Sequence, residues 1–223
     1  MADDVSGSWL SKVTIRDASP SKQMPWWVRA RRKAWMKLTL RDVSGCDNHP
    51  QLDRIYALQD PWGMETERER ARFSATNAII ESAFGPVDSL LEIGCGEGHQ
   101  TEFLAQVSAQ QFGLDVSARA ISLARERMPR AQFHVGDLFD QPWGDQQHRF
   151  DLITACDVLY YMSDIPAALA RMRHLARAGL VTFYAPASAR VAPYLGVIEG
   201  VRHDWIFHGN TVWLVAWWRD GDG

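Results

Sequence analysis

The sequence predicts an α/β domain whose mostly parallel seven-stranded sheet ends in an antiparallel hairpin. Strand-like and helix-like segments alternate through residues 88–184, and strands joined by helices form parallel sheets with right-handed crossovers. Two further strand-like runs, 201–207 and 211–218, flank a short link that contains Gly and Asn, which is typical of antiparallel neighbours. A parallel sheet closed by a hairpin is a more specific prediction than a nucleotide-binding fold in general.

Each element of the alternating part follows from its own pattern. Short apolar runs predict buried strands at 88–93, 111–115, 132–135, 150–155 and 179–184. Helical spacing predicts helices at 65–84, 100–107, 118–128 and 165–175. Between the fifth strand and the hairpin, we expect residues 185–200 to form a short link.

Composition excludes several classes of protein. The 223 residues carry a net charge of −3, which gives no overall electrostatic argument for nucleic-acid binding. A hydrophobic content of 46% is that of a globule rather than a disordered chain. No apolar run approaches the ~20 residues of a membrane span, and the N-terminus lacks the pattern of a secretory signal. Three cysteines make no disulfide framework and no paired zinc site, so we expect a cytoplasmic protein.

Residues 1–50 are predicted to form a basic, tryptophan-rich arm before a domain at 51–223. The segment 22–41 is its centre, with seven basic residues and no acidic one. An amphipathic helix that packs on the domain explains this segment without any function. The alternatives are a lid whose tryptophans stack on sugar rings, a grip on an acidic polymer such as nucleic acid and, more weakly, a membrane-surface helix.

The stretch Leu91-Glu92-Ile93-Gly94-Cys95-Gly96-Glu97-Gly98 stands at a predicted strand-to-helix turn. Glycines there let the backbone pass close to a ligand and leave helix N–H groups free, although a packing turn explains so short a signal without a ligand. A dinucleotide site needs a third glycine where the chain has His99. Glu92, two residues before the first glycine, suits a ligand that ends in an ammonium group.

Two more carboxylates follow at the ends of the next strands. Asp115 ends the second strand, where a carboxylate can accept both hydroxyls of a ribose. Asp137, after the third strand, can accept a hydrogen bond from an adenine amino group beside the apolar Leu138. Each residue alone is explained as a solvated strand end. Glycines and carboxylates on three successive strand ends instead predict a ligand in the crevice at that edge of the sheet.

With these motifs (LEIGCGEG, GLD and VGDLF), residues 58–218 resemble the class I S-adenosylmethionine-dependent methyltransferases, which have a Rossmann-like fold. The stretches DPWG at 60–63 and DVLYY at 157–161 make the chain similar, more narrowly, to the rhizobial nodulation protein S group. That group N-methylates the free amino sugar of a deacetylated chitooligosaccharide.

The resemblance implies S-adenosylmethionine as the cofactor. The residues expected to contact it are Glu92, Gly94, Gly96, Asp115, Val116, Asp137 and Leu138, with Trp62 and Arg72 near its methionine end. Departures from the group concern the acceptor more than the reaction. Arg68 replaces an expected aromatic residue, and Arg177-Ala178-Gly179 replaces a Pro-Gly-Gly turn.

Residues after the fourth strand are expected to face the transferred methyl group. Asp157 would hold the acceptor amine or remove its proton, with Tyr160 and Tyr161 orienting it. A helix cap explains Asp157 equally well, and core packing explains at least one tyrosine. The histidines show no metal-ligand spacing, so we expect no metal; His203 and His208 are expected at the surface and His99 beside the cofactor.

The sequence therefore predicts a methyltransferase for a small-molecule or saccharide acceptor, with transfer to an amino group. The alternatives are O-methylation of a small metabolite, methylation of RNA or protein gripped by the basic arm, and a non-catalytic binding module. Nucleic acid is a less favoured partner than a small molecule, no membrane span is expected, and the sequence does not define the oligomeric state.

Overall fold

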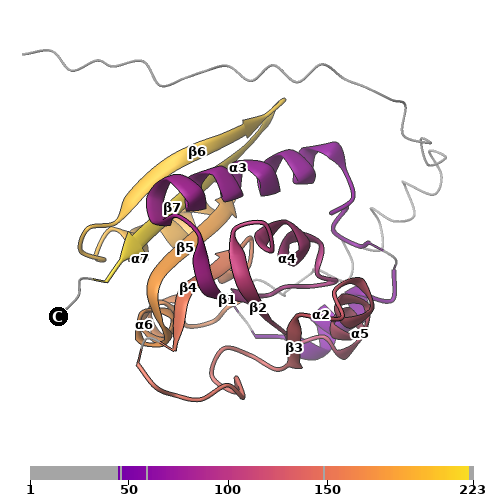
Figure 1. Ribbon diagram of the computed structural model, residues 1–223. Coiled ribbons are helices and arrows are strands. Elements are labelled where there is room, and N and C mark those ends of the chain that lie inside the picture. Colours follow the sequence, from indigo (N-terminus) through magenta and orange to yellow (C-terminus); the bar gives the residue numbers. More distant parts are fainter. Residues whose placement is uncertain (1–44, 46, 59, 148, 221–223) are drawn as a thin grey trace, which may run out of the picture.

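The computed structural model describes residues 45, 47–58, 60–147 and 149–220, and most of the expected arm at 1–50 lies outside the described residues. Seven strands form one sheet (Figure 1). They are β1 (Val87–Ile93), β2 (Ser108–Asp115), β3 (Gln132–Val135), β4 (Phe150–Cys156), β5 (Ala176–Tyr184), β6 (Arg202–His208) and β7 (Thr211–Arg219). The order is β3-β2-β1-β4-β5-β7-β6, in which only β7 runs antiparallel to its neighbours β5 and β6. The predicted fold class is confirmed.

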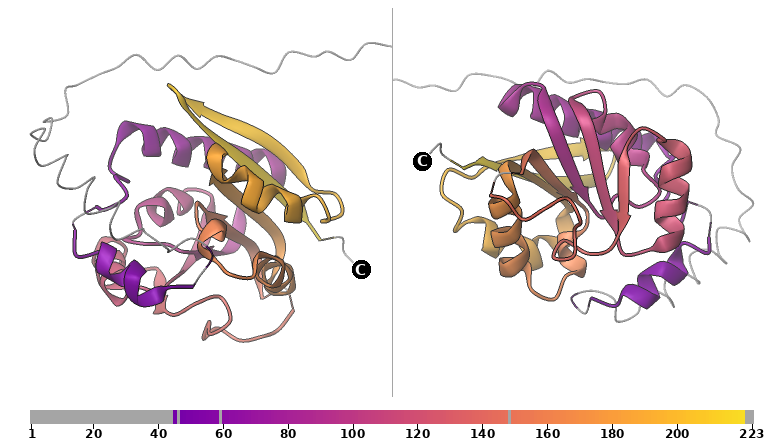
Figure 2. Two further views of the ribbon diagram at one scale, coloured as in Figure 1. Left: turned by 180° about the vertical axis from the view of Figure 1, so that it is seen from behind. Right: turned by 60° about the horizontal axis from the view of Figure 1, so that its bottom comes forward.

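Helices cover both faces of this sheet. They are α2 (His49–Ile55), α3 (Glu67–Phe84), α4 (His99–Leu104), α5 (Ala118–Arg127), α6 (Ile165–Leu175) and α7 (Ser188–Leu195), with short 3₁₀ turns η1 (Leu159–Tyr161) and η2 (Ala185–Ala187). One layer contains α3, α4 and α5, and the other contains α6 and α7, which contact each other and β5 (Figures 1 and 2). Among the described helices, none is long and apolar enough to cross a membrane.

Local side-chain chemistry sets the start of several helices. A side-chain oxygen before the helix accepts a backbone N–H of its first turn, as N-cap residues do. The pairs are Thr66 with Glu69, Ser117 with Ala120 and Asp164 with Ala167, at 3.4, 3.1 and 2.9 Å. All four predicted helices begin within two residues of the predicted positions, and these caps explain three of the four starts.

The prediction differs from the structure at three helices. The helix expected at 100–107 ends at Leu104, because Val107 closes a turn back onto the carbonyl of Leu104 instead. Helix α7 was not predicted, and it occupies the centre of the expected short link at 185–200. An internal Pro193 and the absence of a capping side chain hide this helix, whose buried residues are Val191 and Leu195. Helix α2 was also not predicted. It runs from residue 49 to residue 55 and therefore crosses the expected boundary between arm and domain at residues 50 and 51.

The sheet order brings the carboxyl ends of β1, β2 and β4 together. The chain leaves β1 towards β2 on one side, and β4 lies on the other side of β1. Ligands of open α/β sheets bind in the crevice at such a point of reversal. The glycine loop, Asp115 and Asp157 all follow these three strands directly.

Gly179 in β5 fixes how the hairpin packs on the parallel part of the sheet. It pairs with Trp218 of β7, and a Cβ atom at 179 would lie 2.2 Å from the Trp218 ring. The Trp218 side chain is itself almost fully buried. Only glycine therefore leaves room for this indole, which explains the glycine at position 179 inside strand β5.

We predict that Gly179→Ala lowers the free energy of unfolding by about 1–3 kcal/mol, because the added methyl group overpacks a rigid aromatic ring. Urea denaturation followed by circular dichroism measures this change. Gly196→Ala is the matched control, since Gly196 has a helical φ of −64° and no atom within 4 Å of the added Cβ. Equal effects of the two substitutions would contradict the packing argument.

Candidate functional site

One cavity of about 550 Å³ lies at the carboxyl ends of β1, β2 and β4. All twelve predicted site residues line it, namely Trp62, Arg72, Glu92, Gly94, Gly96, Asp115, Val116, Asp137, Leu138, Asp157, Tyr160 and Tyr161. The structure therefore brings the predicted set together from four strand ends and helix α3. Their individual roles in binding and catalysis stay predictions.

The glycine loop leaves β1 with its backbone in the left-handed region. Gly94 and Gly96 have φ angles of 67° and 53°, which residues with a Cβ adopt at a cost. Space is equally restrictive, because a Cβ at Gly94 would lie 2.3 Å from Val158 and one at Gly96 would lie 2.9 Å from the Tyr56 hydroxyl. Both glycines are thus required by the local backbone and by its close approach to the cavity wall.

Asp115 ends β2 with a buried carboxylate that faces this loop. It accepts hydrogen bonds from the backbone N–H groups of Gly96 and Ser117, both at 2.9 Å. Burial raises the pKa of Asp115 to about 6, and the two N–H donors oppose the rise. The carboxylate is in place to accept ligand hydroxyl groups when it is ionised.

Asp137 and Leu138 form the wall after β3. Asp137 Oδ1 accepts the backbone N–H of Phe139 at 2.7 Å, which orients the half-buried carboxylate. The Leu138 side chain is buried against the core beside it. An apolar side chain next to an oriented acceptor suits a flat heterocycle that carries an amino group.

Glu92 is the most deeply buried carboxylate of the cavity wall, with 2% of its surface exposed. Its Oε2 accepts the Thr101 hydroxyl at 2.5 Å. Burial raises the pKa of Glu92 to about 8, against the lowering effects of Thr101 and Arg72. A cationic ligand group beside Glu92 would therefore be stabilised by ionising it.

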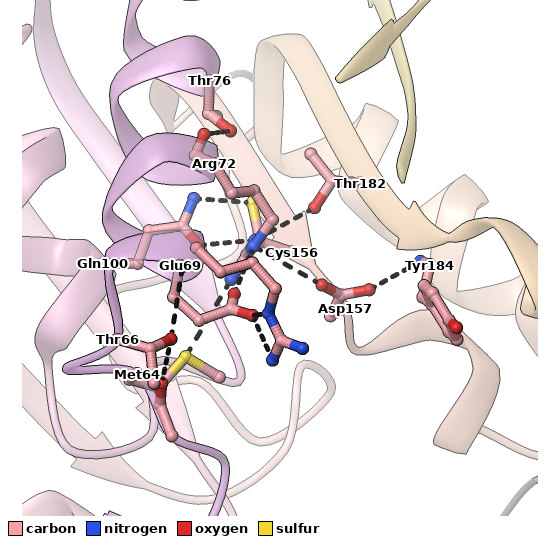
Figure 3. A network of polar contacts seen from close by, with 12 residues as sticks. Met64, Thr66, Glu69, Arg72, Thr76, Gln100, Cys156, Asp157, Thr182 and Tyr184 are labelled. Carbon is pink, nitrogen blue, oxygen red and sulfur yellow. Dashed lines mark hydrogen bonds and ion pairs between the residues drawn. The ribbon is translucent and has the colours of Figure 1, made fainter. Parts of the chain in front are cut away.

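Arg72 of α3 lies at the centre of the polar network in Figure 3. Its Nε donates to Glu69 Oε2 at 2.8 Å and lies 3.6 Å from Asp157 Oδ2, while Nη1 donates to Gln100 and Thr182. Burial lowers the pKa of Arg72, but the carboxylates of Asp157 and Glu69 outweigh it and raise the pKa. The guanidinium is therefore permanently charged and ties α3 to α4, β4 and β5.

Asp157 follows β4 with a left-handed φ of 57°. Its Oδ1 accepts the backbone N–H of Tyr184 at 2.8 Å, across to the end of β5 (Figure 3). The helix-cap interpretation is wrong, because Val158 precedes η1 and no side chain caps it. Burial raises the pKa of Asp157, and Arg72 partly offsets this effect.

Tyr160 and Tyr161 lie beside this carboxylate with their rings tilted by 51° and the ring centroids 4.6 Å apart, and the centroids of Tyr161 and Trp62 are 5.9 Å apart. Tyr160 packs against the core as well, as expected for at least one of the pair. Burial raises the pKa of Tyr161 to about 12 and that of Tyr160 further still. Both phenols are therefore uncharged donors near neutral pH.

Several wall residues were not predicted. Helix α2 contributes His49, Leu52 and Tyr56, and the Tyr56 hydroxyl accepts the Trp62 Nε1–H at 3.1 Å. Asn48 followed by Pro50 is a helix-start signal that would have placed α2. No sequence signal singles out Glu69 or Gln100, because their roles come from contacts with Arg72. His99 lies in the cavity wall as expected, and His203 is exposed on β6.

Glu92 makes stability depend on pH in the ligand-free protein. Its folded pKa is raised, so its contribution to stability is present below the unfolded value of 4.5 and is lost as the pH rises through about 8. We predict that the unfolding free energy falls, relative to Glu92→Gln, by up to about 1.4 kcal/mol per pH unit across this window. Urea titrations between pH 5 and 9 measure it. Glu126→Gln, at an exposed position, is expected to stay parallel to the wild type; parallel curves for Glu92→Gln would refute the assignment.

Comparisons with known proteins find methyltransferases among the relatives of this chain. A family model described as a methyltransferase domain matches residues 91–180. Nodulation protein S of Sinorhizobium fredii is 30% identical over 134 residues, which is 60% of this chain and 62% of that protein. The Rhizobium tropici nodulation protein S is 33% identical over 119 residues, or 53% and 50% of the two chains. The matched part of this chain thus spans about half to three fifths of these relatives.

A solved structure extends the similarity. The N-methyltransferase NodS from Bradyrhizobium japonicum, in complex with S-adenosyl-L-homocysteine, superposes with a TM-score of 0.63 at 28% identity. The match covers 79% of this chain and 100% of the other. The chain is therefore similar to S-adenosylmethionine-dependent methyltransferases and, more narrowly, to the nodulation protein S group.

Proposed function

We propose that this protein transfers a methyl group from S-adenosylmethionine to a nitrogen atom of a small-molecule acceptor, and that the acceptor is an amino saccharide. The carrying observation is the largely buried Asp157 carboxylate, which lines the cavity and is held by Arg72 and the Tyr184 backbone. The saccharide part rests on similarity to the nodulation proteins S and on the aromatic cluster of Trp62, Tyr160 and Tyr161.

The residues present fit the cofactor. Two glycines keep side chains away from the loop, Asp115 offers acceptors for a ribose, and Leu138 provides an apolar surface for adenine. A buried Glu92 suits the ammonium end. The cavity volume of about 550 Å³ is within the usual range for small-molecule sites. When bound, S-adenosylmethionine supplies a methyl group activated by attachment to a sulfonium.

The chain's residues would then hold the acceptor and exclude water. A carboxylate oxygen of Asp157 accepts an acceptor N–H, which aims the nitrogen lone pair and takes up a proton from the amine when one must leave. Arg72 favours the charged state of Asp157 and fixes its position. The uncharged phenols of Tyr160 and Tyr161 donate hydrogen bonds to acceptor hydroxyl groups.

An amine acceptor fits these residues better than a hydroxyl. A neutral amine attacks without a strong base, whereas a hydroxyl needs one to remove its proton. The raised pKa of Tyr161, about 12, makes a phenolate base unfavourable near neutral pH. This difference supports N-methylation over O-methylation. RNA or protein methylation rests on the 1–50 segment, most of which lies outside the described residues.

We predict that Asp157→Asn lowers kcat by about 100-fold or more, because acceptor positioning and proton uptake are lost, while S-adenosylhomocysteine affinity changes little. The assay follows methyl transfer from labelled S-adenosylmethionine to an amino-sugar oligosaccharide. Its N-acetylated counterpart and a simple catechol are the comparison acceptors. The exposed Asp204→Asn is the control variant. Transfer to the catechol but not to the amine would refute N-methylation.

We predict that affinity for S-adenosylhomocysteine falls as the pH decreases through about 6, because protonated Asp115 loses an acceptor for the ribose hydroxyls. Calorimetry between pH 5 and 8 measures the profile. Asp115→Asn should bind about 10-fold or more weakly at pH 8 and lack this pH dependence. A variant with the wild-type profile would show that Asp115 does not contact the ribose.

A further inference from the structure

Three side chains with metal-ligating atoms meet beside the cavity, whose wall includes two of them, Glu97 and His99. Asp60 belongs to the loop before α3, while Glu97 and His99 come from the glycine loop and the first residue of α4. One ligand atom from each lies within 4.8 Å of the other two. Their separation along the chain explains why no metal-ligand spacing is visible in the sequence.

One carboxylate oxygen of Glu97 accepts no hydrogen bond from the residues that the structure describes. Its residue is 7% exposed, and Oε1 has no hydrogen-bond partner among the residues that the structure describes. The other oxygen, Oε2, lies 3.1 Å from His99 Nε2. A buried carboxylate oxygen without a donor costs free energy, so an unpaired one on a residue of this group is consistent with a missing cation.

His99 does not replace this cation, because no protonation state of its Nε2 satisfies both of the short contacts that this nitrogen makes. The same nitrogen lies 3.1 Å from Glu97 Oε2, an acceptor, and 3.1 Å from Arg127 Nη2, a donor. A bare Nε2 accepts from Arg127 but then faces the lone pairs of Glu97. A protonated Nε2 donates to Glu97 but then faces an N–H of Arg127. Either state leaves one short contact unfavourable.

We propose that Asp60, Glu97 and His99 bind a divalent transition-metal ion, for which Zn²⁺ is the best match. Two carboxylates and one imidazole are ligand types that Zn²⁺ takes at about 2.0–2.2 Å, and a water molecule completes a tetrahedral site. Ligands at that distance lie about 3.4 Å apart. Glu97 Oε2 and His99 Nε2 are already 3.1 Å apart, so binding requires a contraction of at most about 1.4 Å in the longest of the three separations.

The surroundings permit this contraction. The Asp60 carboxylate is held by two backbone N–H groups. Oδ1 accepts the N–H of Met64 at 2.6 Å, and Oδ2 accepts the N–H of Glu65 at 3.3 Å. Arg127 must turn away from His99. Its side chain is 30% exposed and already lies 3.7 Å from Glu102, which offers an alternative partner.

The ion joins two segments that both shape the cofactor cavity. The Asp60 loop also carries Trp62, and Glu97 directly follows Gly96 of the glycine loop. A metal bridge holds these segments at a fixed separation, so we assign it a positioning role rather than a catalytic one. This role is independent of which acceptor the protein methylates.

The test uses tag-free, full-length protein freed of metal with a chelator, and calorimetric titration with Zn²⁺, Mn²⁺ and Mg²⁺. We expect one saturable Zn²⁺ site, weaker Mn²⁺ binding and weakest Mg²⁺ binding. Glu97→Gln and, separately, Asp60→Asn should weaken Zn²⁺ binding about 10-fold or more, with unchanged circular dichroism. At Zn²⁺ near 100 times Kd, the Tm of the wild type should rise by about 5–10 °C and that of Glu97→Gln should not.

Two further variants separate this site from adventitious binding. Glu126→Gln removes an exposed carboxylate from α5 and should leave Zn²⁺ affinity unchanged. Arg127→Gln removes the competing cation beside His99 and should strengthen Zn²⁺ binding. The proposal is overturned if no saturable binding occurs, if Glu97→Gln and Asp60→Asn bind as tightly as the wild type, or if Arg127→Gln binds more weakly.

Discussion

The buried guanidinium of Arg72 is the constraint on which the arrangement of the cavity depends. An arginine with 1% of its surface exposed is tolerated only where its charge and N–H groups are paired. The partners come from its own helix, from α4 and from the ends of β4 and β5. Satisfying one cation therefore aligns four separate elements around the cavity, and the loss of Glu69 or Asp157 would leave its charge only partly compensated.

The same cation acts on two carboxylates of the cavity. Asp157 lies 3.6 Å from Arg72, which offsets the effect of burial on its pKa. Glu92 is paired directly with a hydroxyl instead, and its pKa rises to about 8. Burial thus raises the pKa of both acidic residues at these neighbouring strand ends, and Arg72 opposes the rise in each case.

Sequence patterns were sufficient for the strands and for the ligand-facing ends of β1, β2 and β4. Periodicity placed each strand within three residues of its start, and the glycines and acids that follow were visible as motifs. Patterns were not sufficient for α7, which contains Pro193. They were also not sufficient for the long-range partners of Arg72, namely Gln100, Asp157 and Thr182, which meet it only through tertiary packing. The Asp60, Glu97 and His99 group was hidden for the same reason. Local sequence determines which atoms are available at a strand end, whereas long-range contacts determine how they are charged.

The left-handed backbone at Asp157 limits the residue types that this position can tolerate. Aspartate, asparagine and glycine tolerate a φ near 57°, whereas β-branched residues are strained by it. A saturation series at this position would consequently rank side chains by conformational strain before it ranked them by chemistry. In relatives with a different acceptor, we therefore expect changes at the neighbouring tyrosines and in helix α3, and only aspartate, asparagine or glycine at position 157.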